Sequence, residues 1–258
     1  MIHNSSVVDP KSKVSKNVEI GPFCYVGPNV IIAENVKLIS NVHIEGDTKV
    51  GQGTRIFPFA SIGTQPQDLK FKGEDSFVHI GDHAVIRECV TINRGTAALG
   101  ITKIGSHCLI MAYCHIAHDC IIGNNVIFAN HSTLAGHVII ENNVVVGALS
   151  AIHQFSRIGE GAMIGGMTGV TADVIPFSTV MGNRANLCGL NLIGLKRNKI
   201  KRDELNELRK VFKYIFFVKD KTLNFRVNKV KDKNYKFDSI KKILNFIDGD
   251  SKRSFCLP

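Results

Sequence analysis

An apolar residue recurs at every sixth position through most of this chain, from Ile2 as far as Val170. Stepping by six from Ile2 reaches aliphatic side chains without a break as far as Ile62. The series returns at positions 80 to 92 and again from 104 to 170, and both interruptions keep its phase. A repeat that keeps its phase across two insertions predicts stacked, equivalent structural units.

A second series of small or β-branched residues lies two positions before the apolar one, as at Val18, Val36 and Cys108. Residues two apart on a strand point to the same side, so both series line the interior of a coil. A helix would need recurrence near 3.6 residues, and the strands of a β-sandwich vary too much in spacing. The sequence therefore predicts a mainly β protein, with a parallel β-helix over residues 1–184. Glycine often follows the apolar residue, and we expect it to supply a positive φ at each bend.

The two interruptions predict external loops at 64–77 and 93–102, and long loops on a rigid scaffold often carry function. After Pro176 the period stops, and residues 185–258 are predicted to form a small, basic α-helical C-terminal domain. Asp203 is predicted to cap a helix with an apolar stripe from Leu205 to Phe216, and a second helix is expected around 240–247. The last residues, 248–258, are expected to be loosely ordered.

The positive charge of the chain is concentrated in this C-terminal third. Residues 185–258 contain 19 Lys and Arg against 8 Asp and Glu, a net charge of +11, whereas the whole chain carries +10. This imbalance favours an acidic partner at the C-terminal domain, although a merely solvated basic surface is the alternative. No nucleic-acid-binding motif is present, so we expect no nucleic acid partner.

Several absences limit the cellular setting. The sequence contains neither a long apolar run nor a basic and apolar N-terminal leader, which predicts a cytoplasmic protein without stable membrane insertion. The seven cysteines include no C-x-x-C pair, so they are expected to be free thiols. Cys108, Cys114 and Cys120 belong to the inward small series and are predicted to be core side chains rather than metal ligands.

Histidines gather in the middle of the repeat. His115, His118 and Asp119 lie in HIAHDC, and His137 and His153 follow at spacings close to three repeat units. If one coil contains three such units, these side chains fall near one edge of successive coils, which suits proton transfer. Surface imidazoles without a role are one alternative. Zinc is another, but His115 and His118 are awkwardly spaced to bind one ion from a strand, so no metal is expected.

Several sequence strings match one known family. The chain resembles the bacterial UDP-N-acetylglucosamine O-acyltransferases through the strings QDLK, VTINRGT, HIAHDC, AGH and GLNLIGLKR, and the likeness covers nearly the whole chain. The resemblance implies a left-handed coil, a homotrimer with active sites between subunits, and the first step of lipid A synthesis. In that step an (R)-3-hydroxyacyl group passes from acyl carrier protein to the 3-hydroxyl of UDP-N-acetylglucosamine. No cofactor is implied beyond the phosphopantetheine that the carrier protein brings.

The same resemblance assigns roles to individual residues. His118 resembles the general base, Asp119 the carboxylate that holds it, and Gly136 the backbone N–H donor to the oxyanion. Gly166 stands at the position that measures the acyl chain, where a glycine leaves room for a long chain. The remaining matches are substrate-binding positions: Asp68, Lys70, His115, His137, His153 and Gln154 for the sugar nucleotide and the groove, with Asn191 and Arg197 for phosphate.

Two other functions stay open from the sequence. A related N-acyltransferase could use a 3-amino sugar nucleotide on the same scaffold, and a non-catalytic binding solenoid would need neither HIAHDC nor QDLK. The chain also departs from the best-known family members at Asn93, Arg184 and Ile193.

Overall fold

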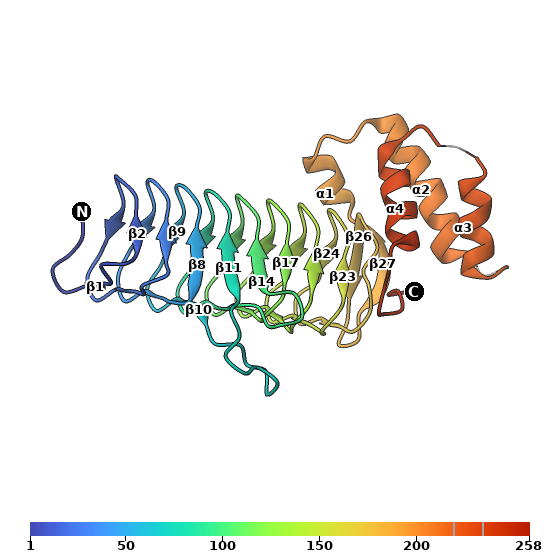
Figure 1. Ribbon diagram of the computed structural model, residues 1–258. Helices are drawn as coiled ribbons and strands as arrows, with labels where there is room; N and C mark the ends of the chain where they lie inside the picture. The colour runs from blue at the N-terminus through green and yellow to red at the C-terminus, as the bar shows by residue number, and fades with distance from the viewer. Residues whose placement is uncertain (219, 234) are drawn as a thin grey trace.

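The chain forms a long three-sided coil with helices at one end. The computed structural model describes residues 1–218, 220–233 and 235–258. Successive short strands pass in turn through three sheets, so each sheet takes every third strand of the coil. The N-terminus lies at one end of the coil and the helices lie at the other (Figure 1). The predicted parallel β-helix followed by a small helical region is confirmed.

The three sheets are named here in the order in which the chain enters them. The first sheet contains β1 (Val7–Val8), β4 (Tyr25–Val26), β7 (His43–Ile44), β10 (Ser61–Thr64), β13 (Thr91–Asn93), β16 (His115–Ile116), β19 (Thr133–Leu134), β22 (Ala151–Ile152) and β25 (Gly169–Val170). The second contains β2 (Lys13–Val14), β5 (Ile31–Ile32), β8 (Asp47–Val50), β11 (Phe77–Ile80), β14 (Ile101–Ile104), β17 (Ile121–Ile122), β20 (Ile139–Ile140) and β23 (Arg157–Ile158). The third contains β3 (Glu19–Ile20), β6 (Lys37–Leu38), β9 (Arg55–Ile56), β12 (Val85–Ile86), β15 (Leu109–Ile110), β18 (Ile127–Phe128), β21 (Val145–Val146), β24 (Met163–Ile164), β26 (Ser178–Met181) and β27 (Asn186–Leu190).

The core is the interior of the coil. The second residue of most strands points inward, and Ile116, Leu134 and Ile152 stack in register at 0–2% exposure. Each of these partners follows the previous one by three repeat units, which confirms the predicted coil length. Cys108, Cys114 and Cys120 are also buried in the core, and all seven cysteines are free, as predicted.

The prediction that glycine supplies the positive φ at each bend is wrong for most bends. Asn125 and Asn143 adopt φ of 57° and 61°, whereas Gly105 and Gly123 do not have a positive φ. The glycines are needed for close approach instead, because a Cβ on Gly105 would lie 2.4 Å from the carbonyl oxygen of Gly123 in the next coil. Asparagine tolerates the left-handed region better than most residues, which suits Asn125 and Asn143, but His107, Leu149 and Phe155 adopt the same positive φ at other bends.

Both loops leave the coil at the corner between the first and second sheets. Residues 65–76 connect β10 to β11, and residues 94–100 connect β13 to β14, each loop slightly shorter than the predicted range. The first loop projects from the coil in Figure 1. The loops hold each other, because the Ala97 N–H donates to Glu74 at 2.9 Å and the Arg94 guanidinium lies 5.3 Å from the centre of the Phe71 ring.

Strand structure continues beyond residue 184, the predicted end of the coil. β27 pairs antiparallel with β26, so residues 186–190 extend the third sheet instead of entering the helical region. The helices then follow as α1 (Leu192–Arg197), α2 (Arg202–Phe217), α3 (Leu223–Lys231) and α4 (Asp238–Asp248). Lys201, not Asp203, is the N-cap of α2, and Asp203 lies in its first turn. None of these helices, within the described ranges, is long and apolar enough to cross a membrane.

The expectation of a loosely ordered C-terminus is wrong. Phe255 pairs with Asp173 as a parallel bridge, and the Cys256 N–H donates to the Asp173 carbonyl at 2.8 Å. Cys256 is only 3% exposed. The tail therefore returns from α4 and packs against the last coils.

Candidate active site

The histidine cluster lies at the corner between the first and second sheets, where the two loops also emerge. Segments 117–120, 135–138 and 153–156 form this corner in three successive coils. The His137 N–H donates to the His118 carbonyl, and the Phe155 N–H donates to the Gly136 carbonyl, at 3.1 and 3.2 Å. The regular length of the coil therefore stacks the corner residues of one coil on those of the next.

His118 and Asp119 form a hydrogen-bonded pair at this corner. Nδ1 of His118 lies 2.8 Å from Oδ2 of Asp119, with side-chain exposures of 12% and 0%. A buried carboxylate at Nδ1 fixes the proton on that nitrogen and leaves Nε2 as the acceptor, the arrangement of an oriented general base. The same carboxylate stabilises the charged imidazole after proton transfer.

Thr96, from the second loop, completes the surroundings of Asp119. Its hydroxyl donates to Oδ2 at 2.6 Å and its backbone N–H donates to Oδ1 at 3.0 Å. Burial alone would raise the pKa of Asp119, but the hydrogen bonds from Thr96 and His118 hold the pKa of this carboxyl below its ordinary value. Asp119 is therefore an ionised partner for His118 at neutral pH.

Gly136 lies directly against the ring of His118. An ideal Cβ on Gly136 would be 2.5 Å from Cε1 and 2.6 Å from Nε2 of that imidazole. Across the described residues, the Gly136 N–H donates no hydrogen bond to the protein. A free backbone donor beside a base is what oxyanion stabilisation requires.

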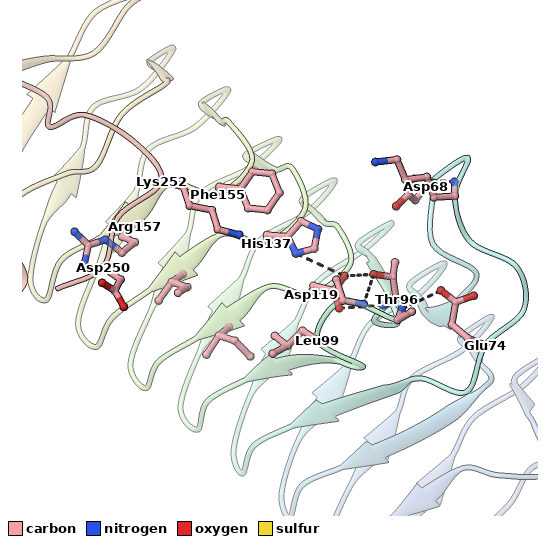
Figure 2. A pocket seen from close by; sticks show the side chains of 15 residues that line it. Asp68, Glu74, Thr96, Leu99, Asp119, His137, Phe155, Arg157, Asp250 and Lys252 are labelled. Carbon is pink, nitrogen blue, oxygen red and sulfur yellow. Dashed lines mark hydrogen bonds and ion pairs between the residues drawn. The ribbon is translucent and has the colours of Figure 1, made fainter.

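Rings stack along the corner above His118. The imidazoles of His118 and His137 meet edge to face at 5.0 Å between centroids, and His137 stacks on Phe155 at 4.5 Å. These three rings are called here the ring column. The ammonium of Lys252, from the C-terminal tail, lies 4.6 Å from the Phe155 ring centre. Burial lowers the pKa of His137, and the charge of Lys252 lowers it further. Figure 2 shows His137 and Phe155 of this column beside Asp119 and Thr96.

Two grooves meet at the corner. A groove of about 530 Å³ on the first sheet, called here the first-sheet groove, is lined by His115, His118, Gly136, His153 and Gln154, among others. A groove of about 710 Å³ on the second sheet, the second-sheet groove, is lined by Asp68, Lys70, Asp119, His137 and Lys252, among others (Figure 2). The structure therefore gathers nine of the predicted site residues around one corner, with the His118–Asp119 pair between the grooves.

His115 faces the first-sheet groove from β16. Its Nδ1 lies 2.7 Å from the hydroxyl of Thr91 on the adjacent strand. Burial lowers the pKa of His115, and the nearby His118 lowers it further. A neutral imidazole held by Thr91 is suited to hydrogen bonding with a polar ligand rather than to carrying charge.

Asn191, Arg197 and Gly166 are not brought to this corner within one chain. The Asn191 side chain caps α1 and donates to the carbonyl of Gly161, at the corner between the second and third sheets. Arg197 ends the same helix. Gly166 lies at the corner between the third and first sheets. The predicted substrate-binding set thus occupies all three corners of the coil.

His118, Asp119 and His137 also form a candidate metal group. One ligand atom from each lies within 4.8 Å of the others. Both oxygens of Asp119 already accept hydrogen bonds from Thr96 and His118, which is the requirement of an oriented base. The expectation that no metal binds here stays a prediction.

The sequence interpretation missed Thr96, Phe155 and Lys252. Thr96 lies in the second predicted loop, but nothing in the spacing of that loop indicates which of its residues contacts Asp119. Phe155 could have been found, because it follows His137 by one full coil and therefore lies directly above it. Lys252 lies in a tail whose polar composition gives no sign of packing.

The sequence and the fold of this chain are both similar to those of known proteins. Residues 173–256 match the family described as Udp N-acetylglucosamine O-acyltransferase, domain 2, and residues 101–136 match the bacterial transferase hexapeptide family. An acyl-[acyl-carrier-protein]–UDP-N-acetylglucosamine O-acyltransferase of Bartonella henselae is 38% identical over 258 residues, 100% of this chain and 94% of that protein. One of the same name from Gloeothece citriformis is 45% identical over 68% of this chain, which spans 63% of that protein. The solved UDP-N-acetylglucosamine acyltransferase of Campylobacter jejuni is 40% identical, with a TM-score of 0.94 over 100% of both chains.

Proposed function

Because the chain belongs to the UDP-N-acetylglucosamine O-acyltransferase family, we propose that it moves an (R)-3-hydroxyacyl group from acyl carrier protein to the 3-hydroxyl of UDP-N-acetylglucosamine. This reaction is the first step of lipid A synthesis. The observation that supports it most directly is the His118–Asp119 pair, which lies between two grooves with Gly136 against the His118 ring.

The proposed reaction uses these groups in the following way. Nε2 of His118 takes the proton of the sugar 3-hydroxyl while that oxygen attacks the thioester carbonyl carbon. The Gly136 N–H donates to the oxyanion of the tetrahedral intermediate. The intermediate collapses with cleavage of the carbon–sulfur bond, and the proton on His118 passes to the leaving pantetheine thiolate. A thioester is already reactive, so positioning, a base and an oxyanion donor suffice.

The polar residues of the grooves are the proposed substrate contacts. Asp68 and Lys70 of the first loop would bind the sugar nucleotide from the second-sheet groove. His115, His153 and Gln154 would line the path of substrate in the first-sheet groove, and His137 would border the acceptor.

We propose a homotrimer because the predicted site residues are divided among all three corners of one coil, and an exposed apolar surface could join one copy to the next. The outward positions of the third sheet are apolar over five strands: Val85, Leu109, Ile127, Val145 and Met163. At the corner between the third and first sheets, Tyr113, Leu149 and Met167 are 56%, 59% and 74% exposed. In a ring of three copies, each chain would bury its third sheet and the adjoining corner against the first sheet of a neighbour. This packing would bring Asn191, Arg197 and Gly166 towards the first-sheet groove of that neighbour.

The basic helices are the proposed docking surface for acyl carrier protein, an acidic partner. An apolar groove of about 300 Å³ lies against α2, flanked by Arg209 and Lys213. Cations around an apolar groove suit an acidic amphipathic segment and speed its encounter. We also propose a cytoplasmic location, in keeping with seven free thiols.

The test is a mass-spectrometric transfer assay. Purified protein is mixed with (R)-3-hydroxymyristoyl carrier protein and UDP-N-acetylglucosamine. We expect an acceptor heavier by one hydroxyacyl group, with a rate that falls by about 10²- to 10⁴-fold in His118→Ala. His107→Ala, at another corner of the coil, serves as the control and should retain the wild-type rate. Full activity in His118→Ala would contradict the mechanism, and transfer only to a 3-amino analogue would contradict the proposed acceptor.

A further inference from the structure

The C-terminal tail lies across the corner that carries the site. Asp250 and Lys252 line the second-sheet groove and lie close to Phe155 and Arg157 (Figure 2). The tail reaches this position from α4, so residues remote in sequence from the histidine cluster contribute to the wall around it.

The tail is held in place by buried contacts around Asp173. The Asp173 carboxylate, 0% exposed, accepts from the Ser251 hydroxyl at 2.6 Å and from Nε of Arg157 at 2.7 Å. The Asp173 backbone N–H donates to the Ser254 carbonyl at 2.7 Å, and Cys256 is buried just beyond. These contacts fix the chain on both sides of residues 252 and 253.

From this fixed position Arg253 contacts two predicted substrate-binding residues, His153 and Gln154. Its Nε donates to the carbonyl of Gln154 at 3.1 Å, and a terminal nitrogen of its guanidinium lies 2.7 Å from Nδ1 of His153. His153 and Gln154 both line the first-sheet groove.

The chemistry of this contact determines where the His153 proton resides. A guanidinium has five N–H donors and no acceptor, and it remains charged in proteins. The short contact therefore requires Nδ1 of His153 to be the acceptor, and in the neutral ring the proton is then on Nε2. The Gln154 carbonyl also lies near Nδ1, but at the longer distance of 3.4 Å, and it already accepts from Arg253. Since Nδ1 of His153 faces Arg253 of the tail, the Nε2–H group of the same ring can donate to a ligand in the groove.

We propose that Arg253 is a positioning residue that holds His153 as the Nε2–H tautomer, so that the ring donates a hydrogen bond to an acceptor oxygen of the bound substrate. This inference rests on the proposed function, because the hydrogen-bond acceptor would belong to a substrate of the proposed acyl transfer that binds in the first-sheet groove. Asp173 and Cys256 already anchor the tail, and an exposed contact of this kind adds little to stability. The value of the Arg253 contact therefore lies in orienting His153.

The kinetic test is a double-mutant cycle of Arg253 and His153. We expect Arg253→Met to lower kcat/KM by about tenfold, the effect of one lost charge-assisted hydrogen bond, and Arg253→Lys, which keeps a cationic donor, to restore part of the loss. In a His153→Ala background the Arg253→Met change should have almost no further effect, because the two residues act through one contact. An equal fold loss in both backgrounds would overturn the proposal. Lys11→Met, at the far end of the coil, controls for loss of one positive charge.

A second readout requires no turnover. With ¹⁵N-labelled histidine, two-bond ¹H–¹⁵N correlations distinguish the two neutral tautomers of His153, assigned by loss of its signals in His153→Ala. The wild type should show a bare Nδ1 and a protonated Nε2, and Arg253→Met should shift His153 towards a tautomer mixture. A proton on Nδ1 in the wild type would overturn the inference. If the wild type transfers no acyl group, the proposed function fails, while this measurement still decides whether Arg253 sets the tautomer.

Discussion

The imidazole of His118 occupies the space that a side chain on Gly136 would need. An ideal Cβ on Gly136 would lie 2.5 Å from Cε1 of the imidazole, far inside van der Waals contact. The imidazole is also fixed by Asp119 at 2.8 Å. The ring therefore cannot accept a methyl group on Gly136 and keep its bond to the carboxylate.

Gly136→Ala should consequently lower activity through geometry rather than through folding. We expect kcat to fall by about 10²-fold, the effect of a base displaced by around 1 Å. The melting temperature should change little, because the displaced ring lies at a corner and not in the core. Mass spectrometry of quenched time points measures kcat, and thermal unfolding measures the melting temperature. An alanine variant with wild-type kcat would mean that His118 is not the base in this position.

Thr96→Val tests the bond that keeps Asp119 ionised. The hydroxyl of Thr96 lowers the pKa of Asp119, so its removal should raise that pKa and weaken the support of His118. Because the pKa is depressed in the folded state, the stability contributed by Asp119 is fully present above its unfolded pKa. That contribution is lost as the pH falls through the lower, folded pKa.

The variant should therefore lose this stability at a higher pH than the wild type, and kcat should fall by about tenfold. Melting temperatures measured from about pH 3 to about pH 7 follow the first effect. Thr54→Val is a matched control, because it removes another buried hydroxyl, which donates to the Gly81 carbonyl at 3.1 Å and lies away from the site. If the melting temperatures of Thr96→Val and the wild type fell together as the pH was lowered, Thr96 would not set the pKa of Asp119.

The limits of sequence interpretation are visible at these residues. The interior of the coil was predictable, because every coil repeats the same inward positions and Ile116, Leu134 and Ile152 recur with one period. The corner could also be placed, since a coil of three repeat units brings His118 close to His137. The contribution of Thr96 could not be predicted, because it depends on the path of a loop with no repeat. The tail was misjudged because Ser251 binds Asp173, 78 residues earlier, and local composition carries no sign of that contact.

Lys252→Gln should raise the pKa of His137. Burial is the main cause of the low pKa of this imidazole, and the ammonium of Lys252 adds a smaller effect in the same direction. The pKa should therefore rise without reaching the value of an exposed histidine, because burial remains. Titration of the His137 ring signals by NMR measures the change, and Lys252→Arg should preserve the low value. An unchanged pKa in Lys252→Gln would place the ammonium away from the ring column in solution.

Gly166→Met should shift the preferred acyl donor towards shorter chains. A Cβ on Gly166 would lie 3.3 Å from the Ala148 carbonyl oxygen and 3.9 Å from its nitrogen, so a side chain can be added with only a small adjustment. A methionine there would occupy the space proposed for the end of a long acyl chain. We expect the ratio of kcat/KM for hydroxymyristoyl over hydroxydecanoyl donors to fall by at least about tenfold, with Gly166→Ala intermediate. Equal ratios in all three proteins would remove Gly166 from the acyl path.

Asp173 and Arg157 form a buried ion pair within the coil, at the place where the tail packs, and breaking this pair should be costly. Nε of Arg157 lies 2.7 Å from Oδ2 of Asp173, with side-chain exposures of 13% and 0%, and the same guanidinium donates to the Phe246 carbonyl of α4. Asp173→Ala leaves Arg157 charged and largely buried, which costs about 3–5 kcal/mol of unfolding free energy. The exposed Lys37–Glu19 pair is a matched control, since its exposures are 47% and 58%. Lys37→Met should cost at most about 1 kcal/mol.

Denaturant unfolding measures both changes, and limited trypsin digestion reports the release of the tail at Lys252 and Arg253. We expect Asp173→Ala to be cut faster at these two residues than the wild type, because the Ser251 anchor and the Arg157 contact are lost together. Adding Arg157→Met to Asp173→Ala should recover part of the free energy, since it removes the unpaired buried charge, but it should not restore resistance to trypsin. If Asp173→Ala and Lys37→Met had equal, small effects on stability, the Asp173 network would not be what anchors the tail.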